Sequence, residues 1–242
     1  MKITWLGQFG VLIETANSTL MMDPYLTDTI AQQSGAAYNR LVPLRETYLH
    51  RTPDVILLSH DHIDHLDIPS LSALLGTARP VEVLAAANAW TKVHTEVGGP
   101  HNYVRVLPGV EWSSGDFHIR AVSAVHSDPT AVGFVIHAEG LTLYLTGDTL
   151  YSRELIEQIG EPVDILFTVI NGVGNNMNAV DAARFAAGLQ PGLTVPVHWG
   201  LFAKYADTPD VFLQEAVKRG VRAHAAQIYE EMDARTMLEE RI

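Results

Sequence analysis

Cysteine is absent from the 242 residues of the chain. This absence excludes disulfide bonds and thiolate metal ligands, so that any bound metal ion must be held by histidine, aspartate or glutamate. A chain without cysteine is compatible with a reducing compartment, where disulfides are rare. We therefore expect a cytoplasmic protein.

Long hydrophobic runs are lacking as well. The apolar segments have the length of strands and are far too short to form a membrane-spanning helix. The opening residues, MKITWLGQFG, have no apolar signal-peptide core followed by a small-residue cleavage site. We therefore expect no membrane association.

Positive charge is scarce, since 16 lysines and arginines face 28 aspartates and glutamates and the formal net charge is −12. Nucleic-acid backbones are bound by basic surfaces, so this balance argues against a nucleic-acid partner. A small-molecule substrate is the expected partner. The sequence leaves open whether the chain forms a homo-oligomer.

Hydrophobic residues make up 47% of the chain, enough for one large core, and no linker divides residues 1–242. We therefore expect a single domain. β-rich stretches alternate twice with mixed α/β stretches, which predicts the α/β class and a four-layer αββα sandwich. Strands are expected at 3–6, 11–14, 19–22, 54–59, 81–85, 103–107, 110–112, 117–125, 132–137, 141–146, 163–169, 193–197 and 221–225. Helices are expected at 69–75, 87–97, 153–159, 178–189 and 209–219, whereas residues 25–51 form a long connection without clear periodicity.

A dense group of metal-ligand side chains follows the expected buried strand at 54–59. The segment HDHIDH contains His60, His62, Asp64 and His65 within six positions. One regular strand would point alternate side chains to opposite faces, but a strand-to-loop turn can direct His60 and His62 to one ion and Asp64 with His65 to a second. The alternative, a solvated polar loop, is disfavoured by this density of ligands.

HDHIDH resembles the HxHxDH signature of the metallo-β-lactamase superfamily. This resemblance implies further ligands downstream, and His126, Asp148 and His198 each follow an expected strand. It also implies that Asp148 bridges two ions, that Asp23 supports the site without ligating, and that Asp64 acts as a general base if only one ion binds. The implied ligands of the first ion are His60, His62 and His126, and those of the second are Asp64, His65 and His198.

Four motifs carry a narrower resemblance to the L-ascorbate-6-phosphate lactonases and related hydrolases: SHDHIDHLD, GDTLYS, NGVGNNMNAVDA and PVHWGLF. It implies a metal-dependent hydrolase that uses metal-activated water on a small anionic substrate, with a sugar-phosphate lactone as the first expectation. The implied cofactor is one or two ions of Zn or Mn, and Fe is also compatible. Gln8 departs from the pattern, because relatives often carry histidine there. The alternatives are a phosphodiesterase of the same fold and a metal-stabilised binding protein without turnover.

Substrate contacts are expected from the Asn-rich loop through Asn171, Asn175 and Asn176, and from Lys204, which would bind an anionic group. The alternatives are a plain turn, since Asn and Gly tolerate left-handed backbone, and a solvated surface lysine. Arg40 and Arg45 are candidates of the same kind as Lys204. Asn178 is expected to cap a helix.

Overall fold

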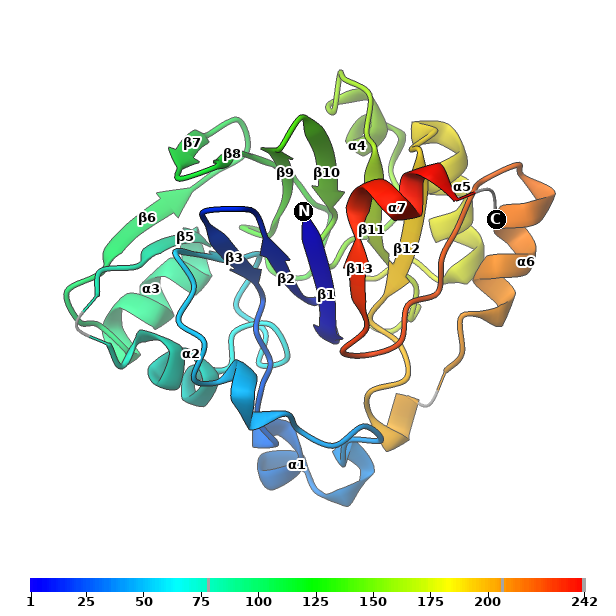
Figure 1. Cartoon of the computed structure of the whole chain (residues 1–242). Helices are drawn as coiled ribbons and strands as arrows, with labels where there is room; N and C mark the ends of the chain where they lie inside the picture. Colours follow the sequence, from blue (N-terminus) through cyan, green and yellow to red (C-terminus); the bar gives the residue numbers. More distant parts are fainter. Residues whose placement is uncertain (78, 206, 241–242) are drawn as a thin grey trace.

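The computed structural model describes residues 1–77, 79–205 and 207–240. Two sheets lie face to face between outer helices, and the predicted αββα sandwich is confirmed (Figure 1). The first sheet has the order β13-β1-β2-β3-β4-β5-β6 and the second β12-β11-β10-β9-β8-β7. The first sheet consists of β1 (Lys2–Gly7), β2 (Gly10–Glu14), β3 (Thr19–Met22), β4 (Val55–Leu58), β5 (Glu82–Ala86), β6 (Asn102–Val106) and β13 (Glu231–Asp233). The second consists of β7 (Glu111–Ser114), β8 (Phe117–Ser123), β9 (Val132–Ala138), β10 (Leu141–Leu145), β11 (Ile165–Val169) and β12 (Leu193–Val197).

Strand direction changes within each sheet. β1, β2 and β3 pair antiparallel, whereas β3, β4, β5 and β6 run parallel. In the second sheet β10, β11 and β12 are the parallel strands. All four residues of β4 are buried, because a parallel strand inside a sandwich is covered on both faces.

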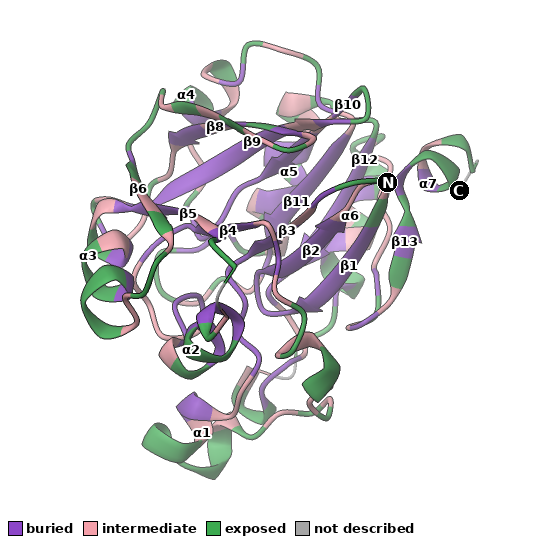
Figure 2. Ribbon diagram, turned by 60° about the vertical axis from the view of Figure 1, so that its left-hand side comes forward, coloured by how far each residue is buried: buried purple, intermediate pink, exposed green. Residues whose placement is uncertain are grey.

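Helices cover the outer faces and leave the strands buried between them (Figure 2). α2 (Ile68–Leu75) and α3 (Ala87–Glu96) accompany the first sheet, and α4 (Arg153–Glu157), α5 (Ala179–Leu189) and α6 (Asp210–Lys218) the second. The predicted cap is confirmed, since the Asn178 side chain accepts hydrogen bonds from the backbone N–H groups of Val180 and Asp181. No helix among the described residues is both long and apolar enough to span a bilayer.

One expected strand was wrong, and the long connection contains short elements that were not predicted. The strand expected at 221–225 is a single parallel bridge between Ala223 and Thr194, and the chain instead adds β13 and α7 (Ala234–Glu239). The 25–51 segment contains α1 (Thr29–Ser34) and two 3-10 turns, η1 (Ala36–Tyr38) and η2 (Glu46–Tyr48). Elements this short depend on tertiary contacts rather than on their own periodicity, which explains why the sequence pattern missed them.

Segment 25–51 lies against the residues that follow β12. Backbone N–H of Leu41 donates to the Leu201 carbonyl at 2.7 Å, and that of Ala203 to the Asn39 carbonyl at 3.0 Å. Tyr25, Ile30, Leu201 and Phe202 form a hydrophobic cluster separate from the main core. α1 therefore projects below the sandwich yet is fastened to it (Figure 1).

Candidate metal centre

The predicted ligands lie in loops at the carboxyl ends of strands from both sheets. His60 and His62 follow β4 of the first sheet, whereas His126, Asp148 and His198 follow β8, β10 and β12 of the second. Open α/β sheets build their sites at this edge, where loops from different strands converge.

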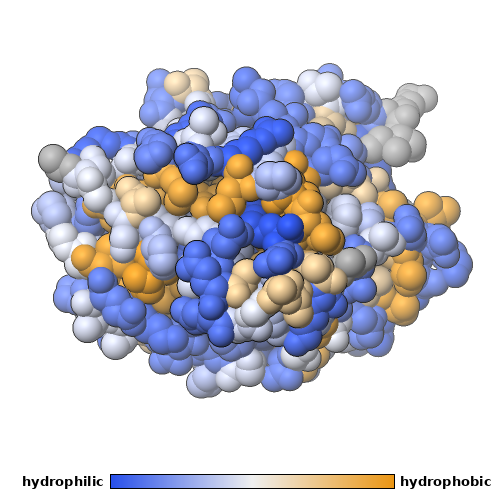
Figure 3. Space-filling model, turned by 90° about the horizontal axis from the view of Figure 1, so that it is seen from below, coloured by the Kyte–Doolittle hydropathy of each residue, from blue (hydrophilic) through white to orange (hydrophobic). Residues whose placement is uncertain are grey.

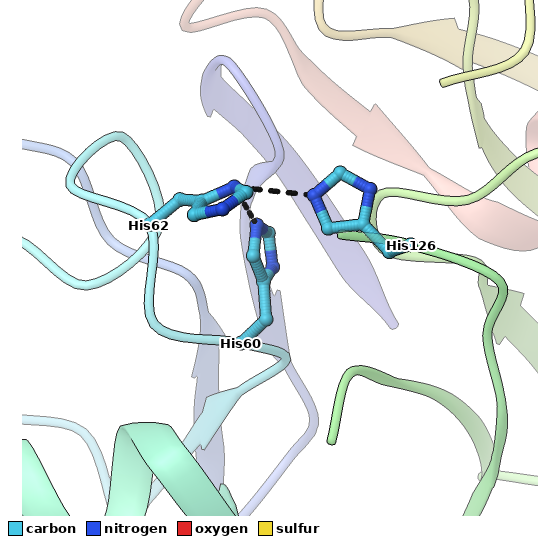
Figure 4. A group of neighbouring side chains, drawn as sticks. All are labelled: His60, His62 and His126. Carbon is cyan, nitrogen blue, oxygen red and sulfur yellow. Dashed lines mark hydrogen bonds between the residues drawn. The ribbon is translucent and has the colours of Figure 1, made fainter. Parts of the chain in front are cut away.

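Three imidazoles form the first group of donors (Figure 4). His62 Nδ1 lies 3.0 Å from His60 Nε2 and 3.1 Å from His126 Nε2. A tetrahedral ion with bonds of about 2.0–2.1 Å separates its ligand atoms by about 3.3 Å, so this spacing fits one Zn-sized ion.

The second group consists of Asp64, His65 and His198. His65 Nε2 and His198 Nε2 are 3.2 Å apart, and Asp64 Oδ2 lies 3.3 Å from the latter and 3.8 Å from the former. In each group the donor atoms lie within 4.8 Å of one another. The structure therefore brings together, in two sets, the six ligands that the family resemblance implied.

Asp148 lies between the two groups. Its Oδ1 is 3.3 Å from His65 Nε2 and 3.4 Å from His198 Nε2, and its Oδ2 is 3.9 Å from His126 Nε2. Oδ1 is buried and has no hydrogen-bond partner among the described residues. A buried carboxylate oxygen without a partner, aimed at converging imidazoles, is what a bridging ligand requires. The residues present therefore fit one or two divalent ions.

Asp23 lies behind the ligand side chains, in contact with Ser59 and His65. It could form a third donor group with His60 and His65. Its oxygens are already engaged, however, because Oδ1 accepts from the Ser59 backbone N–H at 2.8 Å and Oδ2 lies 2.8 Å from His65 Nδ1. A carboxylate on the far nitrogen of a ligating histidine fixes the ring and its tautomer.

Three amide side chains hold ligands from behind. Gln8 Nε2 donates to Asp64 Oδ2 at 2.9 Å, and Asn176 Nδ2 donates to Asp148 Oδ2 at 2.7 Å. The Asn171 amide lies 2.9 Å from His198 Nδ1. Asn175 contributes its backbone carbonyl, 3.0 Å from His126 Nδ1. The three asparagines expected to contact substrate thus touch metal-ligand side chains, and they also line the pocket beside them.

Backbone strain is concentrated at this site. Gln8, Asp23 and His198 have φ of 47°, 44° and 65°, in the left-handed region that few residues other than glycine adopt. Such conformations cost free energy and persist where surrounding contacts enforce them, commonly at functional sites. Residue type alone gives no signal for this placement.

The two groups differ in their electrostatics in the absence of metal. Burial lowers the pKa of His60 well below its ordinary value and also lowers that of His126. Burial acts in the same direction on His65 and His198, but the carboxylate of Asp148, joined by that of Asp64, outweighs it and raises the pKa of both. The second group is therefore the one in which a cation must displace protons.

A pocket of about 290 Å³ opens beside the two groups. His62, Asp64, His126, Asp148 and His198 form part of its lining. Lys204 does not line it, and a wider hollow of about 540 Å³ near Arg40 contains none of the ligands.

Residues 18–199 match the family described as beta-lactamase superfamily domain. A UPF0173 metal-dependent hydrolase from Anoxybacillus flavithermus is 31% identical over 238 residues, covering 92% of this chain and 97% of the relative. The chain belongs to this hydrolase family. The expected superfamily is thereby confirmed, and members of this family are named metal-dependent hydrolases.

Solved structures share the fold of this UPF0173 hydrolase. Igni18, a metallo hydrolase from Ignicoccus hospitalis, superposes with a TM-score of 0.74 at 20% identity, covering 96% of this chain and 97% of its own. An isothiocyanate hydrolase from Delia radicum gut bacteria gives a TM-score of 0.75 at 18% identity, covering 96% and 98%.

Sequence patterns missed the apolar and aromatic residues that line the pocket of this UPF0173 hydrolase. Ile30, Tyr38, Phe202 and Tyr205 come from α1, η1 and the segment after His198, and they meet only in three dimensions. Segment 25–51 lacked periodicity, and its length is the one sequence signal that could have pointed to a functional loop.

Proposed function

We propose that this metal-dependent hydrolase cleaves a lactone or related carboxylic ester in a small molecule. One observation carries the proposal. Two groups of three donor atoms lie on either side of Asp148, beside a pocket of small-molecule size. Bound divalent ions would lower the pKa of water toward about 7 and polarise the scissile carbonyl.

The chain's own residues would supply binding, orientation and proton transfer. If only one ion binds, held by His60, His62 and His126, Asp64 would be free to accept a proton from the attacking water, because it lines the pocket and is held by Gln8. That proton would pass to the alkoxide oxygen released when the acyl C–O bond breaks. Asn176 and Asn171 keep Asp148 and His198 in position throughout.

The phosphodiesterase alternative has weaker support. Neither lysine nor arginine lines the pocket within the described parts of the chain, so a phosphate group would meet no side-chain cation beyond the metal centre. A binding protein without turnover is disfavoured because each expected ligand is present and oriented.

The test combines elemental analysis with turnover in one preparation, purified without chelator or nickel. One or two equivalents of Zn, Mn or Fe with chelator-sensitive cleavage of lactones supports the proposal. Cleavage of phosphodiesters alone would replace it with the alternative. Failure to retain any supplied ion and to cleave either panel would refute it.

A further inference from the structure

The pocket is lined by two unlike sets of side chains. One set consists of the metal-ligand side chains, and the other consists of apolar and aromatic side chains from four separate segments. The face of the molecule from which α1 projects shows hydrophobic patches set among hydrophilic residues (Figure 3). The apolar wall of the pocket consists of Ile30, Tyr38, Ile63, Val173, Phe202 and Tyr205.

The part of this wall that comes from segment 25–51 and residues 202–205 is held by packing contacts among its own aromatic side chains. Phe202 is 3% exposed and packs edge-on against Tyr25 and Tyr38, with ring centroids 5.6 and 5.9 Å apart. Tyr38 also packs edge-on against Tyr205 at 6.0 Å. An antiparallel bridge joins Arg40 to Phe202, so both sides of the wall are tied together. A small-molecule pocket that is largely preformed costs little to occupy.

The cation closest to this wall is already engaged by it. Lys204 Nζ donates to Tyr38 Oη at 2.7 Å and lies over the rings of Tyr38 and Tyr205, 4.7 and 5.2 Å from their centroids. The ammonium therefore already has a tyrosine hydroxyl and two aromatic faces as partners, and Lys204 does not line the pocket.

The arginines of segment 25–51 are also engaged elsewhere. The Arg40 guanidinium donates to the carbonyls of Tyr25 and Thr27, both at 3.4 Å, and to Tyr229 Oη at 3.2 Å. The Arg45 guanidinium lies over the Tyr229 ring, 4.7 Å from its centroid. These arginines fasten the loop and do not face the substrate space.

We infer that the apolar wall binds an uncharged aromatic or branched aliphatic group of the substrate, remote from the bond that is cleaved. The inference rests on the proposed function and replaces the expected anionic sugar-phosphate with a neutral substrate. A phosphate or carboxylate against this wall would lose its hydration without gaining a cation, whereas an apolar group gains from leaving water.

Binding of non-hydrolysable lactams to the metal-loaded protein tests the inference without requiring turnover. Calorimetry would compare a γ-lactam bearing a phenyl or isobutyl substituent with the same lactam bearing a carboxylate or phosphate on the substituent. We expect the apolar lactam to bind at least about tenfold tighter. Equal binding, or tighter binding of the charged lactam, would overturn the inference.

Two variants locate the effect. Tyr38→Ala and Tyr205→Ala should each weaken binding of the phenyl lactam several-fold, leaving metal content and binding of the unsubstituted lactam unchanged. The control is Tyr103→Ala, which removes a part-buried tyrosine on β6, outside the pocket. Phenyl-lactam binding unaffected by either wall variant would also overturn the inference.

Turnover of the matching lactones separates the two proposals. Cleavage that favours the charged lactone would contradict the inference and leave the hydrolase proposal intact. Apolar lactams that bind as expected, without cleavage of any lactone, would contradict the reaction and leave the inference intact.

Discussion

Asp148 faces both groups of ligand atoms, with one oxygen toward His65 and His198 and the other toward His126. Replacing it by alanine should remove the shared ligand, so that Asp148→Ala loses metal and at least about 100-fold in turnover together. Elemental analysis and turnover on one preparation measure both. His94→Ala, an exposed histidine on α3, should change neither. Full metal content and activity in Asp148→Ala would contradict the bridging role.

Gln8 contacts the metal centre through the carboxylate of Asp64. Because its amide donates to Asp64 Oδ2, Gln8→Ala should leave Asp64 less well oriented and weaken binding of one of two ions by about 10–100-fold. Stepwise metal titration followed by calorimetry measures this. The control is Gln214→Ala, an exposed glutamine on α6. Unchanged affinities for both ions would show that Gln8 does not position Asp64.

At the residue scale the sequence was informative where chemistry depends on residue type. A cluster of His and Asp residues after a buried strand predicts a metal site, and the structure brings those side chains together. The left-handed backbone at Asp23 and His198 could not be predicted from the sequence, because contacts from distant segments impose it.

The turn after β10 is the element that places Asp148. Gly147 has φ of +60°, and an added Cβ would lie 3.0 Å from the Val132 carbonyl oxygen and 3.1 Å from Ser59 Cβ. Gly147→Ala should therefore lower the free energy of unfolding by about 1–3 kcal/mol, measured by urea denaturation. Gly109→Ala is the matched control, because Gly109 has φ of +89° with nothing within 4 Å of its Cβ position. Equal losses would attribute the effect to backbone strain alone.

Asp54 joins two neighbouring parallel strands. Its Oδ2 accepts from the backbone N–H and the hydroxyl of Thr19 at 2.8 and 3.0 Å, and it pairs with Arg79. Burial raises the pKa of Asp54, but the bonds from Arg79 and Thr19 outweigh burial and lower it. A depressed folded-state pKa means that the stabilisation is present at neutral pH and is lost as pH falls below the ordinary value of about 3.9.

Asp54→Ala should accordingly lower the free energy of unfolding at pH 7 by about 1–2 kcal/mol, mostly through the Thr19 bonds, because the Arg79 pair is half exposed. The difference from the unmodified protein should shrink as the pH is lowered toward about 4 and below. Urea denaturation over this range, with the exposed Glu96→Ala as control, would refute the assignment if the gap were independent of pH.

Elements could be predicted where a long pattern specifies them. The buried run of β4 and the capped start of α5 are such cases. β13 has only three residues and forms by pairing with the edge of β1. The strand predicted at 221–225 does not form, because a single bridge between Ala223 and Thr194 stands in its place. No local signal distinguishes these outcomes.

The metal centre links the two sheets of the molecule, since its ligands follow β4 of one and β8, β10 and β12 of the other. An ion that binds only the folded state should stabilise it by about 2.7 kcal/mol at a hundredfold excess over its dissociation constant. The raised pKa of His65 and His198 gives the pH dependence, because these imidazoles must lose protons to ligate. Metal stabilisation should be large at high pH and fade as pH falls through those pKa values.

Thermal unfolding with and without chelator, at about pH 8 and about pH 5.5, measures this. The chelator should lower Tm clearly at the higher pH and little at the lower one. Asp148→Ala should show a reduced chelator effect at both. A chelator effect that grows on acidification would contradict the proposed ligation by His65 and His198.

At the scale of the whole molecule, the alternation of β-rich and α/β stretches predicted the sandwich, because layers follow from hydrophobic patterning. The apolar wall could not be predicted, since most of it forms where residues 30–38 meet residues 202–205. Such a meeting depends on the completed fold.

Because segment 25–51 is held against the residues after His198, Ile30, Tyr38 and Tyr205 of the apolar wall lie on stretches of chain that carry no metal ligand. Relatives that share the metal-ligand loops can therefore differ in substrate preference through substitutions at a few positions of the apolar wall. In the laboratory, a library randomised at Ile30, Tyr38 and Tyr205 would search for new substrates while every metal ligand stays as inherited.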